Sequence, residues 1–158
     1  MSDPSHVGSP AGAVVVEEAT AVSDELMAAL AGLVPQLSRT SPVPSRAEVD
    51  EIVASAATCL LVARAGDGTI VGLLTLVLFR IPTGVRAWVE DVVVDQSVRG
   101  QGIGETLGRE ALRRAAAAGA RTVDLTSRPS REAANRMYRR LGFEVRDTNV
   151  YRMVLGTG

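Results

Sequence analysis

One short stretch limits what this chain can fold into. A run of three valines at 92–94 leads into Arg-Gly-Gln-Gly-Ile-Gly at 99–104, and a segment rich in Ala and Arg follows at once with helical spacing of its apolar residues. Glycines let a backbone approach a ligand closely, and the start of a helix offers N–H groups and the positive end of its dipole. The stretch therefore predicts a strand, a turn that binds an anion such as a pyrophosphate, and a helix.

The glycine spacing does not match two common nucleotide-binding patterns. Gly100, Gly102 and Gly104 are spaced Gly-x-Gly-x-Gly, whereas the dinucleotide fold needs Gly-x-Gly-x-x-Gly. No Gly-Lys-Ser/Thr of a phosphate loop is present either. Taken alone, the turn also fits a helix start whose small residues serve close packing. A nucleotide-binding domain for another phosphate ligand remains a weaker alternative.

Composition narrows the chemistry. With 158 residues, 46% of them hydrophobic, the chain suits one compact domain. The net charge of −1 gives no basic surface for nucleic acid and no polybasic membrane patch. A single histidine, His6, and a single cysteine, Cys59, argue against a Ser-His-Asp triad, a disulfide and a metal site. Carboxylates, tyrosine, hydroxyls, backbone amides or a cofactor must supply the chemistry.

The N-terminus differs in composition from the rest. Residues 1–12 are rich in Ser, Pro and Gly and lack the basic start and apolar stretch of a signal peptide. We expect residues 1–12 to be a disordered tail and residues 13–158 to form a single domain. Without an apolar run of about 18 residues, no membrane span is expected, and a cytoplasmic location is predicted.

Apolar periodicity and turn residues predict an ordered set of elements. Ser23 and Ser45 are predicted helix caps, the latter with Glu48 at capping-box spacing. Ser130 is a predicted cap of the last helix, and Gly119 ends the helix before it. The expected strands cover 14–18, 58–64, 69–80, 85–95 and 122–126, with one or two more within 143–155. The expected helices begin at Ser23–Asp24 and end near Pro35, begin at Ser45 with Val49, Ile52 and Val53 inward, cover 102–118, and run from Ser130 to about Leu141.

This order predicts the fold class. The first half consists mainly of hairpins, which favours antiparallel pairing, whereas a right-handed crossover in the second half makes two strands parallel. The expectation is an α/β (α+β) fold with a mixed, mostly antiparallel central sheet and helices on both faces.

Two motifs together resemble a known family. The turn at 99–104 is similar to the Arg/Gln-x-x-Gly-x-Gly/Ala motif of the GNAT superfamily of N-acetyltransferases. Residues 134–143 resemble that family's Ala-x-x-x-Tyr-x-x-x-Gly-Phe segment, and the separation and element order also agree, so the resemblance covers about residues 13–155. It implies a GNAT-like fold, acetyl-CoA as cosubstrate, no metal, and an amine as acceptor. Homodimers are common in the family.

The resemblance also implies which residues hold the cofactor. The strand before the glycines would splay from its neighbour and bind the pantetheine arm through its backbone, and Asn135 matches a frequent pantetheine contact. Arg131 stands where the family often has Asn. The backbone amides of the turn would hold the pyrophosphate. The implied cofactor residues are Val92, Val93, Val94, Arg99, Gly100, Gln101, Gly102, Ile103, Gly104, Glu105 and Asn135.

Tyr138 is implied as general acid, because it matches the tyrosine near the thioester sulfur. Amide formation from a thioester needs a neutral amine held about 3 Å from the carbonyl carbon, a donor for the carbonyl oxygen, and a proton or hydrogen bond for the thiolate. Direct attack in a ternary complex needs no enzyme nucleophile. The alternative for Tyr138 is an ordinary packed aromatic side chain.

Glu90 is the first candidate for general base, directly or through water, with Asp91 as the second. Neighbouring strand residues face opposite sides, so both cannot point into one site without a bulge. A Glu-Asp pair before this strand run resembles family members that act on amino sugars. The alternative for Glu90 is a solvated carboxylate or a salt bridge to Arg80 or Arg86.

The acceptor is not encoded in a readable motif. A small-molecule amine, an amino sugar, an aminoglycoside, a polyamine or a peptide amine all fit. A second function of a different class also fits: a non-catalytic module that binds acyl-CoA and regulates a partner. Intact Tyr138 and Asn135 favour the enzyme.

Overall fold

A computed structural model describes residues 12–156 of the chain. Apart from Gly12, the tail expected for residues 1–12 lies outside the described residues. The elements follow the order β1 (Val15–Glu18), α1 (Asp24–Leu37), α2 (Arg46–Ala54), β2 (Thr58–Arg64), β3 (Ile70–Ile81), β4 (Gly84–Val94), the 3₁₀ turn η1 (Gln96–Val98), α3 (Ile103–Ala117), β5 (Val123–Asp124) and α4 (Glu132–Arg140).

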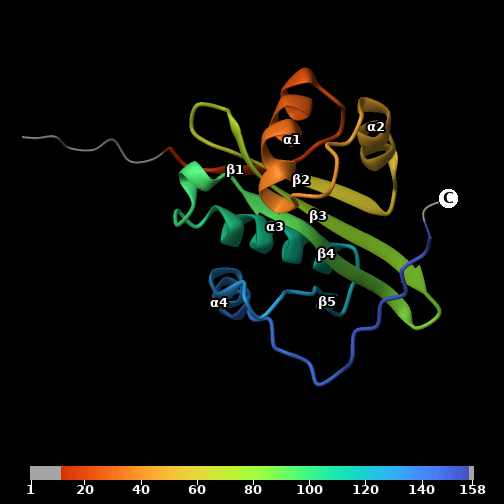
Figure 1. The fold of residues 1–158 in the computed structure, drawn as a ribbon. Helices are drawn as coiled ribbons and strands as arrows, with labels where there is room; N and C mark the ends of the chain where they lie inside the picture. Colours follow the sequence, from red (N-terminus) through yellow and green to blue (C-terminus); the bar gives the residue numbers. More distant parts are fainter. Residues whose placement is uncertain (1–11, 157–158) are drawn as a thin grey trace, which may run out of the picture.

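The strands form one sheet in the order β1-β2-β3-β4-β5. The first four strands pair antiparallel, and β5 joins β4 in parallel through Ala87–Val123 and Trp88–Asp124. Figure 1 shows α1 and α2 above this sheet and α3 below it. The predicted mixed, mostly antiparallel sheet with helices on both faces is therefore confirmed.

Each face of the sheet carries its own apolar core. Alternate residues of β2, Leu60 and Val62, pack with Leu26, Leu30 and other residues of α1 and α2. The intervening residues of β2 pack on the other side against α3. This alternation assigns every residue of the central strands to the α1/α2 face or to the α3 face.

Local signals set most helix ends. Ser23 caps α1, and Ser45 and Glu48 form the predicted capping box at the start of α2. Gly119 has φ of +84°, as a helix-ending residue in the left-handed region requires. The cap predicted at Ser130 is wrong: α4 begins after Arg131, and no side chain caps it within the described residues.

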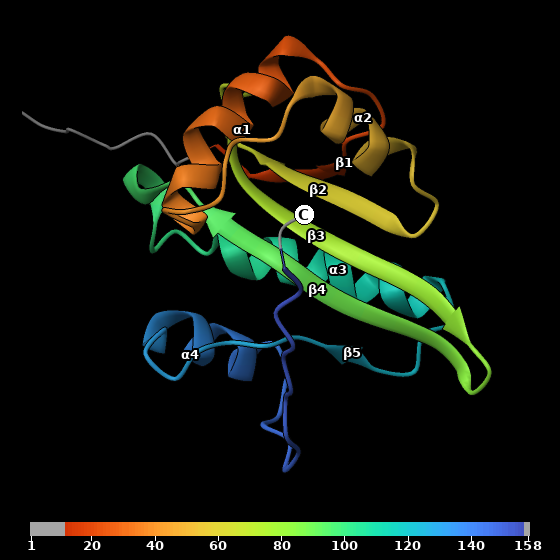
Figure 2. The same ribbon diagram turned by 45° about the vertical axis from the view of Figure 1, so that its right-hand side comes forward.

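The predicted final strands are also wrong. Residues 143–155 contain no strand, and β5 is only two residues long where five were expected. Six large apolar side chains of this segment are 73–88% exposed: Val145, Val150, Tyr151, Met153, Val154 and Leu155. Strand propensity needs a partner edge to act on, and β5 offers a ladder of only two residues. Figure 2 shows this segment after α4 as an irregular coil.

Among residues 12–156, no helix is long and apolar enough to cross a membrane.

Candidate active site

A bulge interrupts β4 beside the predicted base. Leu73 pairs with Val93 and Thr75 pairs with Glu90, so Leu74 alone lies opposite two residues of β4. Asp91 has φ of +50°, the one positive value outside glycine in the described part of the chain. This is the geometry of a β-bulge, which bends the strand and breaks its alternation. Glu90 and Asp91 therefore lie at the kind of irregularity that neighbouring strand residues need if both are to point to one side.

The bulge coincides with a free edge of β4. Because β5 pairs only with Ala87 and Trp88, the edge of β4 from residue 89 to 94 has no strand beside it in the described structure. The backbone groups that point to this side of Val92, Val93 and Val94 are therefore open to a ligand. The pairing of β4 with β5 therefore ends before the valine run begins.

The free edge ends at the glycine turn. Gly100 and Gly102 adopt left-handed conformations, with φ of +81° and +78°, and a Cβ at either position would meet no atom within 4 Å. Gly102 is the N-cap of α3, and within residues 12–156 no side chain caps this helix. The first amides of α3 therefore point outward without a side-chain partner, beside the positive end of the helix dipole. Outward-pointing amides beside the positive end of a helix dipole suit a pyrophosphate.

Gly104 and Gly108 serve packing. A Cβ on Gly104 would lie 2.9 Å from the Met137 sulfur, and a Cβ on Gly108 would lie 2.5 Å from a Leu141 methyl group. These two glycines, one turn apart on α3, let α4 approach closely. The packing interpretation of the small residues thus holds for Gly104, while its backbone amide still belongs to the first turn.

Charged contacts fix the turn between its neighbours. Glu105 accepts from Arg109 on α3 at 2.5 Å and from Arg140 on α4 at 3.2 Å, which lowers the pKa of its carboxyl. The Nε of Arg99 donates to the Val94 carbonyl at 3.3 Å. Glu105 and Arg99 therefore hold α4 and the end of β4 against the glycine turn.

Gln36 is a site-positioning residue that the sequence did not reveal. Its Nε2 donates to Asp95 Oδ2 at 3.1 Å, and its Oε1 accepts from the Gln96 amide at 2.9 Å. Asp95 also accepts from the amide and hydroxyl of Ser97, and these bonds together lower its pKa. The last turn of α1 is thereby joined to the entrance of the glycine turn. Gln36 lies 59 positions before Asp95 and 60 before Gln96 in the sequence, and no local pattern predicts contacts over such separations.

Tyr138 lies on α4, one residue after the methionine that contacts Gly104. Its ring packs edge-on against Phe143, with centroids 5.8 Å apart and planes at 73°. Burial raises the pKa of its hydroxyl above the ordinary value, and the Arg131 charge acts in the opposite direction. The hydroxyl therefore stays protonated at neutral pH. Asn135, one turn earlier, donates to the Arg128 carbonyl at 2.9 Å and so orders the segment before α4.

Glu90 lies on the α1/α2 face of the sheet. Ala87 and Val89 of β4 belong to the core on the α3 face, so Trp88 and Glu90 face the other way. The indole N–H of Trp88 donates to Glu90 Oε1 at 2.8 Å. Within residues 12–156 neither Arg80 nor Arg86 pairs with Glu90, so the salt-bridge alternative is wrong and the carboxylate is exposed.

Cys59 is unsuited to be a nucleophile. It faces the α3 core and is 8% exposed. Burial, followed by the Glu18 charge, raises the pKa of its thiol to about 11, although the Arg114 guanidinium 3.7 Å from the sulfur acts the other way. A neutral thiol attacks a thioester poorly. Both features argue against an acyl-cysteine intermediate at Cys59.

We expect Cys59 to resist thiol reagents in the native protein and to react at once in denaturant. The thiol has a pKa of about 8.5 in the unfolded chain. Because its pKa is higher in the folded protein, folding favours the protonated thiol. The free energy of unfolding should then fall as pH rises from about 8.5 towards 11. Timed reaction with a chromogenic disulfide at pH 8, with and without urea, checks the first point. Fast labelling of the folded protein would contradict it.

Comparison with known proteins agrees with this geometry. Residues 26–143 match the model of the acetyltransferase (GNAT) family. No curated protein sequence matches the chain. The fold matches a solved structure described as a transcriptional regulator from Bacillus halodurans C-125, with 28% identity and a TM-score of 0.75 over 90% of this chain and 100% of the other.

Two further solved structures share the fold. One is an acetyltransferase from Trypanosoma brucei, with 22% identity and a TM-score of 0.73 over 90% of this chain and 100% of the other. The other is aminoglycoside N-acetyltransferase AAC(6')-Iy in complex with CoA, with 18% identity and a TM-score of 0.76 over 94% of this chain and 98% of the other.

The family match covers three quarters of the chain and includes the free edge of β4, the glycine turn and Tyr138. The chain belongs to the GNAT family of acetyltransferases.

Proposed function

We propose that this protein transfers an acetyl group from acetyl-CoA to a primary amine by direct attack in a ternary complex. The observation that carries the proposal is the continuity of three features: a strand edge free of partners, a glycine turn with an uncapped helix behind it, and a helix bearing Tyr138 packed on that turn. An extended thioester arm with a pyrophosphate at one end fits this arrangement.

In the proposed complex the pantetheine arm pairs with the backbone of Val92, Val93 and Val94. The pyrophosphate accepts from the amides of residues 99–105, and Asn135 contributes near the arm. CoA bound to AAC(6')-Iy, a protein of the same fold, supports acetyl-CoA as the cosubstrate.

The proposed reaction conserves protons as follows. Glu90, directly or through water, accepts a proton from the acceptor ammonium; Asp91 is the second candidate. The neutral amine attacks the thioester carbonyl and a C–N bond forms; the nitrogen loses its second proton to water, and the C–S bond breaks. The departing thiolate receives a hydrogen bond or a proton from the Tyr138 hydroxyl, a proton given by Tyr138 is replaced from water, and the amide and CoA leave.

A second function has one observation in its favour. The solved structure at 28% identity is described as a transcriptional regulator. A non-catalytic module that binds acyl-CoA would keep the glycine turn and the strand edge, but it would need neither Tyr138 nor Glu90. Turnover of an amine separates the two functions.

The first test is calorimetric titration of the protein with acetyl-CoA, ATP and NAD. We expect selective binding of acetyl-CoA. Gly102→Ala should weaken it, because alanine is strained at φ of +78° in the cofactor turn. Gly119→Ala is the matched control: its φ is +84°, its surroundings are equally open, and it lies past the far end of α3. A folded protein that binds no acetyl-CoA would contradict the proposed function.

A further inference from the structure

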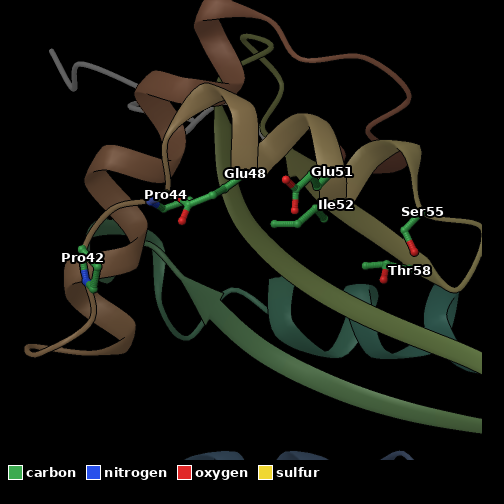
Figure 3. A pocket seen from close by; sticks show the side chains of 7 residues that line it. All are labelled: Pro42, Pro44, Glu48, Glu51, Ile52, Ser55 and Thr58. Atoms are coloured by element: carbon green, nitrogen blue, oxygen red, sulfur yellow. The ribbon is translucent and has the colours of Figure 1, made fainter. Parts of the chain in front are cut away.

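A groove separate from the glycine turn opens between α2 and the sheet. It has a volume of about 520 Å³ and is bounded by Pro42 and Pro44 of the α1–α2 loop, Glu48, Glu51 and Ser55 on one side of α2 or just after it, and Thr58 at the start of β2. Figure 3 shows Glu48, Glu51 and Ile52 on α2, Pro42 and Pro44 on the loop before this helix, and Ser55 and Thr58 after it. Spacings of three and four residues place the α2 members on one helix face.

The sheet face beside this groove also carries the proposed base. Thr58 of β2 pairs with Val77 of β3, and Val77 pairs with Trp88 of β4. Thr58 and Trp88 therefore lie in one row on the α1/α2 face, two strand spacings apart, which is about 10 Å. The indole N–H of Trp88 donates a hydrogen bond to the Glu90 carboxylate. The groove and Glu90 thus occupy the same face of the sheet.

The groove is lined by two carboxyl groups, those of Glu48 and Glu51. Hydrogen bonds from the Ser45 backbone and side chain lower the pKa of Glu48 and hold one of its oxygens in the capping box. Glu51, one turn further, has no ion pair or hydrogen bond with any of residues 12–156. No arginine or histidine lines the groove. Its polar lining therefore favours cations.

Acidic residues and arginines are distributed unequally along the chain, with the acidic excess in the part that contains the groove. Residues 12–98, which form β1 to β4 with α1 and α2, contain eleven acidic residues and five arginines. Residues 99–156, which contain the glycine turn, α3 and α4, have six acidic residues and twelve arginines. The cofactor side of the molecule is suited to a polyanion such as CoA, whereas the groove side is suited to a cation.

We infer that the acceptor is an elongated molecule with an ammonium group at each end. This inference rests on the proposed function. One ammonium is held by Glu51, with Glu48 beside it, and the other reaches Glu90, loses its proton there and is acetylated. A monoamine has no group for the groove and binds only at the reacting end.

The test compares a monoamine with a terminal diamine of the same carbon chain, at three chain lengths, by release of free CoA. We expect the longest diamine to have a KM about two- to fivefold below that of its monoamine, the contribution of one ion pair in a groove open to solvent. The advantage should shrink when the salt concentration is raised from low to high, because exposed charges are screened.

Glu51→Gln should remove the diamine advantage and leave the monoamine KM and the kcat of both unchanged. Asp50→Asn is the matched control, since it removes the same charge from the next position of α2 but does not line the groove. Equal KM values for monoamine and diamine in the unchanged protein, or an equal effect of both substitutions, would overturn the inference while leaving acetyl transfer intact. No turnover of any amine despite acetyl-CoA binding would instead contradict the proposed enzyme.

Discussion

Tyr138→Phe should lower kcat by about 10²–10⁴-fold, the range over which a positioned general acid contributes. The substitution removes only the hydroxyl. The ring keeps its edge-on contact with Phe143, so the fold and the KM for acetyl-CoA should change little. Steady-state rates of CoA release, together with the thermal unfolding midpoint of both proteins, measure these quantities.

The pH dependence gives an independent check on Tyr138. Because burial raises the pKa of its hydroxyl above about 10, the protonated form persists through neutral and mildly alkaline pH. The unchanged protein should therefore show no loss of kcat from this group below pH 10. Since a thiol has a lower pKa than this hydroxyl, full proton transfer is uphill, and the hydroxyl acts chiefly by hydrogen bonding. A kcat of Tyr138→Phe within twofold of the original would exclude the role.

Glu90→Gln should lower kcat/KM for the amine by about 10²-fold or more at neutral pH. The glutamine keeps an acceptor for the Trp88 N–H but takes up no proton. Without the base, only amine that is already neutral in solution reacts, so the rise of rate with pH should flatten near neutrality and move towards the amine's own pKa, near about 10. Rates from pH 6 to 10 record this shift.

Asp91→Asn is the matched control, since it removes the same charge one residue further along β4. If Glu90 is the base, the pH profile of Asp91→Asn keeps its shape. A flattened profile for Asp91→Asn with a normal one for Glu90→Gln would transfer the role to Asp91. Unchanged profiles for both would leave water as the proton acceptor.

Features held by neighbouring residues were predictable from the sequence. The capping box of Ser45 and Glu48, the helix end at Gly119 and the alternation of β2 depend on short spacings that recur in many proteins. The face of Glu90 follows from the same alternation once its strand is known. The fold class then followed from the order of such elements.

Features that depend on pairing between distant residues were not predictable. The bulge at Asp91 exists because two residues of β4 lie opposite Leu74 of β3, and nothing in the strand's own sequence gives that register. The hydrogen bond from Gln36 to Asp95 joins residues that are 59 positions apart in the sequence. The expected strands within 143–155 show the converse error, since strand-forming side chains without a matching edge stay irregular.

The glycine turn shows why a motif can be read in two ways at once. Gly100 and Gly102 need positive φ in open space, as a ligand-binding turn does, whereas Gly104 has ordinary φ and faces Met137. In the sequence all three positions are glycine, so the residue type alone does not distinguish these roles. Only the position of α4 separates them.

The bulge in β4 has a consequence for how this gene can change. Up to Glu90 the even-numbered residues of β4 face α1 and α2, and beyond Asp91 the odd-numbered Val93 does so. Deleting one residue at the bulge would restore a regular ladder and leave both Glu90 and Val93 on the α1/α2 face, because their partners Thr75 and Leu73 are themselves two residues apart. The strand would lose the bend that the extra residue gives it between Glu90 and the glycine turn. Point substitutions keep that bend, whereas a single-codon deletion at the bulge should straighten the strand and shift Glu90 relative to the turn.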